Sequence, residues 1–170
     1  LLYDVSEFNM ADTLRAAARA SMGFNWTRFM MWYSAVVVEK KDMPLRFGGH
    51  PEHPRLEGDV IESISILKKE REKLEGLKCR DSVITDLILA FRALELMNRE
   101  LLYVNDAEGY GDKDALQGDF DTWFSDYSKA WLRDNKPSGL NRIREVIESI
   151  TDVPKNKSKE YYESLKKENE

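Results

Sequence analysis

Two histidines and a carboxylate stand close together in this chain, and they are the first residues that could do chemistry. His50 and His53 flank Glu52, with a proline after each histidine, at positions 51 and 54. Zinc-binding histidines on a helix are normally four residues apart so that both face the ion, but here the spacing is three, within a proline-broken segment. The chain has no other histidine. We therefore expect no metal and no cofactor here, and interpret the segment as a solvated or interface loop.

Acidic residues are the next candidates, because two converging carboxylates with separated pKa values can carry out glycosidase or aspartyl chemistry. They are frequent between positions 112 and 126, as Asp112, Asp114, Asp119, Asp121 and Asp126. No sequence feature makes them converge on a pocket, and acidic residues near a helix start are usually caps and dipole partners. We predict no catalytic residue among them.

Large aromatic residues recur at helical spacing in two segments. Flat rings can stack on sugar faces, and Trp and Tyr also anchor protein interfaces, but at this spacing they are more often core residues. Sugar binding and protein binding both stay open as alternatives. The candidate ligand or interface residues are the two histidines and five aromatic residues: His50, His53, Trp26, Tyr33, Trp123, Tyr127 and Trp131.

The elements that must position these side chains are helices, because apolar residues recur every three or four positions and no segment has a period-two strand pattern. The pattern predicts helices over about 9–22, 25–38, 57–75, 82–103, 112–135 and 139–150. The second is apolar almost all round. Glycines and prolines break the chain between Asp42 and Leu56. We predict an all-α antiparallel bundle of about five to six helices with one long Pro/Gly-rich loop. Residues 1–154 form a single helical domain, and residues 155–170 form a charged C-terminal helix or tail.

Composition excludes several classes of partner. The formal net charge is -5, so no basic field attracts nucleic acid. No apolar run approaches the roughly 20 residues that span a bilayer, so we expect no membrane contact. The single Cys79 cannot form an internal disulfide, and we interpret it as a structural thiol. Because the chain opens on Leu1 rather than Met, we expect a piece of a longer protein.

A helix stop, a turn and a helix start follow one another between Trp131 and Leu140. Lys136 precedes Pro137 and must avoid the αR region, so the helix should end near Asn135. Ser138 is then expected to cap the next helix.

The pattern aromatic-x-x-Tyr-x-x-x-Trp-Leu-x-x-Asn-Lys-x-x-Gly-Leu covers this junction and resembles a known family. Its residues are Phe124, Tyr127, Trp131, Leu132, Asn135, Lys136, Gly139 and Leu140. It resembles the C-terminal helical region of bacterial glycoside hydrolase family 20 enzymes, which are β-N-acetylhexosaminidases. The match is strongest over residues 120–145.

The resemblance implies a non-catalytic accessory domain that stabilises or dimerises a catalytic barrel and shapes its rim through the 42–56 loop. The family's catalytic Asp-Glu pair would lie on that barrel, so no catalytic residue is transferred to this chain. Its expected partners are the barrel of a parent chain or a second copy. The alternative is a free-standing helical bundle that binds a protein partner or a small apolar ligand among its aromatic helices. An enzyme active on its own is the third alternative.

Overall fold

The chain folds as an all-α bundle, as the sequence predicts. The computed structural model describes residues 9–21, 34–39, 49–50, 53–54, 57–78 and 81–152. In this part of the chain there are five α-helices, a π-helical turn at Ser34–Val38 and a 3₁₀ turn at Pro137–Gly139. The helices are α1 (Met10–Ser21), α3 (Glu57–Glu75), α4 (Ser82–Val104), α5 (Lys113–Asp134) and α6 (Leu140–Thr151).

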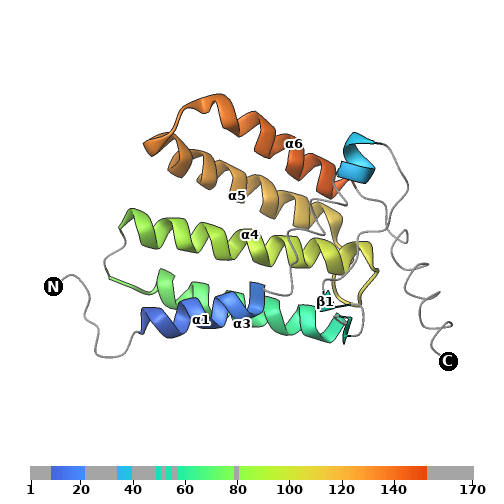
Figure 1. Ribbon diagram of the computed structural model, residues 1–170, viewed down its shortest axis with the longest axis horizontal. Helices are drawn as coiled ribbons and strands as arrows, with labels where there is room; N and C mark the ends of the chain where they lie inside the picture. The colour runs from blue at the N-terminus through green and yellow to red at the C-terminus, as the bar shows by residue number, and fades with distance from the viewer. Residues whose placement is uncertain are drawn as a thin grey trace.

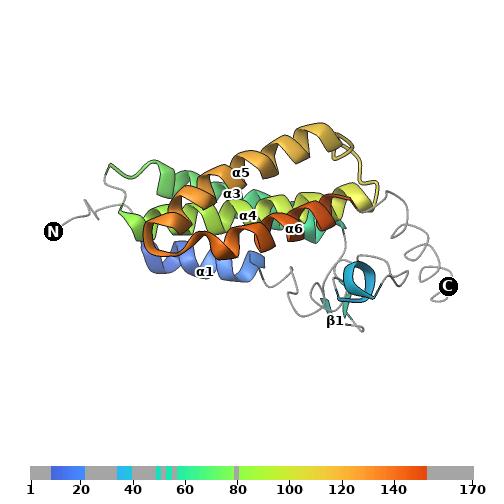
Figure 2. The same cartoon turned by 90° about the horizontal axis from the view of Figure 1, so that it is seen from above.

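Helix α4 lies in the middle of the bundle (Figure 1). Helix α3 packs along one side of α4 and carries α1, while α5 packs along the other side and carries α6. Successive helices from α3 to α6 run in opposite directions, and Figure 2 shows the same set of helices from above. The antiparallel bundle is therefore confirmed for the described residues.

Acidic and amide side chains fix where three of the helices begin. The Asp81 carboxylate accepts a hydrogen bond from the Ile84 backbone N–H at 2.9 Å, and Asp112 accepts one from Ala115 at 2.9 Å. Asn9 Oδ1 likewise accepts from the Ala11 N–H at 3.0 Å. Each bond satisfies a backbone donor that the first helical turn leaves free. The sequence-based starts near Asp81 and Asp112 are confirmed.

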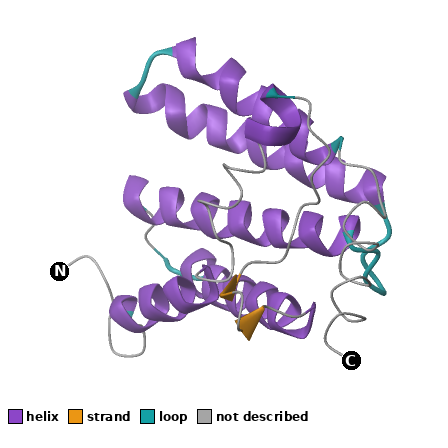
Figure 3. Ribbon diagram, turned by 45° about the vertical axis from the view of Figure 1, so that its right-hand side comes forward, coloured by secondary structure: helices purple, strands orange, loops and turns teal. Residues whose placement is uncertain are grey.

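A small hairpin departs from the expectation that the chain has no strands. Gly49–His50 (β1) and His53–Pro54 (β2) form an antiparallel pair in which His50 is opposite His53 (Figure 3). Two residues are too few to show an alternating pattern, so sequence periodicity could not reveal them. The rest of the predicted 42–56 loop lies outside the described residues.

Two apolar clusters share α4. The first contains buried residues of α1, α3 and α4, among them Leu67, Leu74 and Ile84. The second is built mainly by α4, α5 and α6, with Leu96, Phe120, Trp123 and Ile147 among its buried members. No helix in the described ranges is both long and apolar enough to cross a membrane. The second cluster borders a groove.

Candidate binding groove

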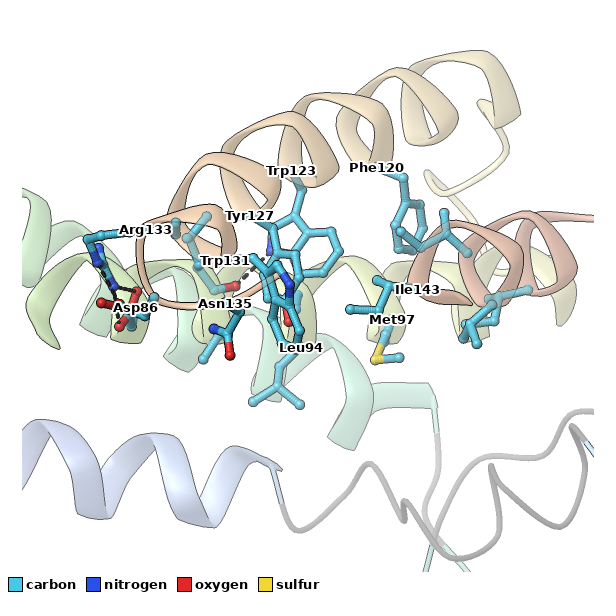
Figure 4. A pocket seen from close by; sticks show the side chains of 18 residues that line it. Asp86, Leu94, Met97, Phe120, Trp123, Tyr127, Trp131, Arg133, Asn135 and Ile143 are labelled. Carbon is cyan, nitrogen blue, oxygen red and sulfur yellow. Dashed lines mark hydrogen bonds and ion pairs between the residues drawn. The ribbon is translucent and has the colours of Figure 1, made fainter. Parts of the chain in front are cut away.

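A half-open groove of about 710 Å³ lies between α4, α5 and α6 (Figure 4). Its walls are mostly apolar, and its charged residues are Asp86, Arg133 and Asp134. The apolar and aromatic lining comes from α4 (Leu89, Ala90, Ala93, Leu94, Met97), α5 (Phe120, Trp123, Tyr127, Ala130, Trp131) and α6 (Ile143, Val146, Ile147, Ile150). Cavities of roughly 300–1,000 Å³ with such a lining are typical of ligand sites.

Three aromatic rings form a ladder along the α5 wall. Trp123 and Tyr127 stack with their centroids 4.9 Å apart, and Tyr127 and Trp131 are tilted at 6.0 Å. The four-residue spacing places them one above the other on the same helix face. Trp123 is 8% exposed and belongs to the core, whereas Tyr127 and Trp131 are half-buried. The sequence-based expectation of a core aromatic therefore fits Trp123 best.

Both indole N–H groups of this ladder already have partners inside the protein. Trp123 Nε1 donates to the Leu89 carbonyl at 2.9 Å, which joins α5 to α4. Trp131 Nε1 donates to the Lys136 carbonyl at 2.8 Å. A sugar ligand needs hydrogen-bonding groups around its ring, but these two donors are occupied and most of the remaining wall is hydrocarbon. The groove is consequently better suited to an apolar group than to a sugar.

The turn between α5 and α6 packs against the ring of Trp131. Lys136 is extended (φ -79°, ψ 154°), as expected before Pro137, and α5 ends at Asp134 with Asn135 as its C-cap. A Cβ added to Gly139 would lie 3.0 Å from Cζ2 of the Trp131 ring, so only glycine lets the turn approach this closely. The spacing of Trp131, Lys136 and Gly139 is thus explained by a contact that fixes one end of the groove.

The prediction that Ser138 caps the last helix is wrong. Residues Pro137–Gly139 form a 3₁₀ turn, and Gly139 occupies the N-cap position of α6 with no side-chain hydrogen bond. The extra turn moves the start of the helix beyond the serine. The Trp131 contact with the Lys136 carbonyl and Gly139, rather than a hydroxyl cap, joins this turn to the preceding helix.

The charged residues gather at one end of the groove. Arg133 Nη2 donates to both carboxylate oxygens of Asp86, at 3.0 and 2.9 Å, and Arg133 Nε donates to Asp134 at 2.8 Å. Burial, and to a smaller extent the negative charge of Asp86, raises the pKa of the Tyr127 hydroxyl. The field of this carboxylate therefore reaches the aromatic ladder.

Three of the seven candidate residues line the groove: Trp123, Tyr127 and Trp131. Trp26 and Tyr33 lie outside the described residues, as do most of the predicted 25–38 helix and Cys79. His50 and His53 are placed by their backbone pairing in the hairpin. Within the described ranges, no group of three or more His, Cys, Asp or Glu side chains could hold a metal ion.

Three of the acidic residues between positions 112 and 126 have structural partners. Asp112 caps the helix, Asp119 pairs with Arg99 on α4, and Asp126 pairs with Lys129 at 3.1 Å and with Arg92 at 3.6 Å. None of them lines the groove. Asp112 matches the sequence-based interpretation of a helix cap, whereas the ion pairs of Asp119 and Asp126 were not predicted.

Sequence reasoning missed the α4 and α6 walls as parts of one site. Helical periodicity places Leu94 and Ile143 on buried helix faces, but nothing in the sequence distinguishes Met97. Periodicity identifies the buried face of a helix, but it does not tell which helices meet or where they leave a gap. Asp86 and Arg133, 47 positions apart, carried no signal at all.

Fold and groove together define a small all-α bundle with an apolar cavity at one side of its central helix. Comparison of the chain with protein-family models, with curated proteins and with solved structures gave no match.

Proposed function

We propose that this chain is a non-catalytic helical binding domain whose site is the groove between α4, α5 and α6, and that its ligand is a small apolar molecule. The observation that carries the proposal is the apolar cavity of about 710 Å³, which three helices line. Burying apolar ligand surface in such a cavity contributes about 25 cal/mol per Å² before the costs of association. Octan-1-ol is a suitable neutral probe.

The test follows the indole N–H signals of Trp123 and Trp131 by NMR while octan-1-ol is titrated into the chain. We expect both signals to shift in a saturable way, because both rings line the groove. Ala93→Phe should abolish the shifts by filling the cavity from α4. Ala115→Phe is the matched control, since Ala115 is an exposed α5 residue outside the groove and its substitution should leave binding intact.

Equal binding by the Ala93→Phe variant would place the probe elsewhere and contradict the proposal, as would the absence of saturable binding by the parent chain.

A second candidate is the accessory domain of a β-N-acetylhexosaminidase-like glycoside hydrolase. One observation favours it: Tyr127, Trp131 and Asn135, which carry the resemblance to that family, line the groove. In this case the groove receives apolar side chains of the catalytic barrel, and the domain stabilises or dimerises its parent. The chain itself then contributes no catalytic group.

Two measurements test this candidate. The reading frame upstream of Leu1 should encode a barrel with an adjacent Asp-Glu pair, and a start codon immediately before Leu1 would overturn the candidate. The isolated chain should not cleave an N-acetylglucosaminide substrate, because the catalytic pair would be on the barrel. Measurable turnover that copurifies with the chain would contradict both candidates, since each assigns it a non-catalytic role.

A further inference from the structure

The charged end of the groove carries more negative than positive charge. Two carboxylates, Asp86 and Asp134, share the single guanidinium of Arg133, which leaves a formal charge of about -1 among these three groups. The side chains of Asp86 and Asp134 are 53% and 65% exposed, so both remain accessible to a bound molecule. The groove is therefore apolar along its length and weakly anionic at one end.

An anionic ligand has no free counter-charge here. Arg133 is the only cationic side chain among the groove-lining residues, and it already donates to both carboxylates. A carboxylate or sulfate head group would have to displace one of these contacts while approaching the other acid. Repulsion between the negative head group and that carboxylate disfavours binding.

A cation finds two kinds of partner at the same end. Asp86 and Asp134 offer oxygen atoms that accept further hydrogen bonds or attract an ammonium group. The tilted Tyr127 and Trp131 rings line the same groove, and aromatic faces attract a cation within about 6 Å. Because the Trp131 N–H is turned to the Lys136 carbonyl, its donor is not aimed at such a cation.

Resting on the proposed function of this groove, we infer that its ligand class is the amphipathic cation. The apolar body lies along the Trp123, Leu94 and Met97 walls, and an amine or quaternary ammonium group lies at the Asp86 end. The anionic end of the groove favours this class, because the apolar walls alone would bind a neutral chain whatever its end group.

The experiment compares three probes with the same eight-carbon chain: octyltrimethylammonium, octan-1-ol and octanoate, each below its micellar concentration. Affinities come from the Trp123 and Trp131 indole N–H shifts at low ionic strength. We expect the cation to bind at least about fivefold more tightly than the alcohol, and octanoate to bind most weakly. The advantage of the cation should shrink as salt is added, because the carboxylates are exposed.

Asp86→Asn isolates the charge. This variant should lose most of the preference for octyltrimethylammonium over octan-1-ol, because Arg133 then balances only Asp134 and the aromatic rings alone attract the cation. Asp126→Asn is the control: Asp126 is a comparably exposed carboxylate on α5 that does not line the groove, and its substitution should keep the preference. Thermal unfolding by circular dichroism checks that both variants fold.

The outcomes separate this inference from the proposed function. If octan-1-ol binds in the groove and the cation binds no better, or octanoate binds best, the inference is overturned while the binding domain stands. A cation preference that is undiminished in Asp86→Asn or at high salt also overturns it. If none of the three probes binds, the small-molecule function itself fails.

Discussion

The two sides of α4 differ in how they are packed. On the side that faces α1 and α3, leucine side chains fill the space and buried polar groups join the helices. On the side that faces α5 and α6, aromatic rings border an open groove. Arg71 of α3 holds Glu95 of α4 through two hydrogen bonds of 2.7 and 3.1 Å, and Thr13 of α1 donates to Glu70 of α3 at 2.8 Å. The pairs that join α4 to α5 through Arg92, Arg99 and Arg133 are more exposed.

The two faces of α4 therefore differ in how tightly they are packed. On the α1 and α3 side Leu67 and Leu74 are fully buried, and the largely buried Arg71–Glu95 pair joins α3 to α4. On the α5 and α6 side, the rings of Trp123, Tyr127 and Trp131 border the groove of about 710 Å³. Under the proposed function, the two faces of α4 serve stability and binding separately.

The largest expected effect concerns Glu100, a buried carboxyl whose Oε1 has no hydrogen-bond partner, in contrast to the paired Glu70 and Glu95. Glu100 is 2% exposed, and its Oε1 accepts no hydrogen bond. Burial raises its pKa from 4.5 to about 8, and the charge of Lys113 offsets this only in part. For Glu70, burial also acts to raise the pKa, but hydrogen bonds from Lys73 and Thr13 outweigh it and the pKa is lowered.

The sign of the Glu100 effect follows from its raised pKa. Between pH 4.5 and about 8 the unfolded chain binds fewer protons than the folded one, so stability falls as pH rises. The total loss is on the order of 5 kcal/mol. Glu100→Gln should remove this slope and be the more stable protein at pH 8. Urea unfolding at a series of pH values measures the slope in both proteins, and an equal slope in the two would mean that Glu100 is not its source.

Next in size is the loss of core volume. Leu67 of α3 is fully buried, so Leu67→Ala should lower the free energy of unfolding by about 2–5 kcal/mol. Ile143→Ala in the α6 wall of the groove should cost clearly less, because that side chain already borders open space. Chemical denaturation compares the two variants, and equal losses would remove the distinction between the two sides of α4.

Third in size is the loss of an ion pair, tested by replacing arginine with methionine in one pair on each side of α4. Arg71→Met should cost about 3 kcal/mol, because it leaves the largely buried Glu95 without its partner. Hydrogen bonding to Glu95 raises the pKa of Arg71, so the guanidinium is charged at every working pH. Arg133→Met at the exposed end of the groove should be far milder. A similar loss in both variants would contradict the contrast.

The smallest expected effect is at the junction that carries the sequence resemblance. Gly139→Ala places a Cβ 3.0 Å from Trp131, so the ring must move although the backbone conformation suits alanine. We expect a net loss of about 1 kcal/mol and a shifted Trp131 indole N–H signal. Gly118→Ala is the control: nothing lies within 4 Å, so it should stabilise α5 by roughly 0.5–1 kcal/mol. If Gly139→Ala were more stable than the parent chain, the Trp131 ring would have moved aside without a cost in stability.

By itself, the sequence determined the helical class, the antiparallel order and most helix ends, because periodicity, caps and breakers act within a few residues. Asp81, Asp112, Gly76 and Pro137 each marked a boundary that the structure has. The exception was Ser138, because the 3₁₀ turn that displaces the cap depends on how Trp131 meets Gly139.

Only the tertiary structure decided which faces meet. The aromatic spacing of Trp123, Tyr127 and Trp131 was visible in the sequence, but the groove also needs α4 and α6 walls that come from distant positions. The charge at its end depends on Asp86 and Arg133, which are 47 residues apart and meet only because α4 and α5 run antiparallel. Local sequence determines which side chains each helix presents, whereas the packing of α4, α5 and α6 determines the space between them.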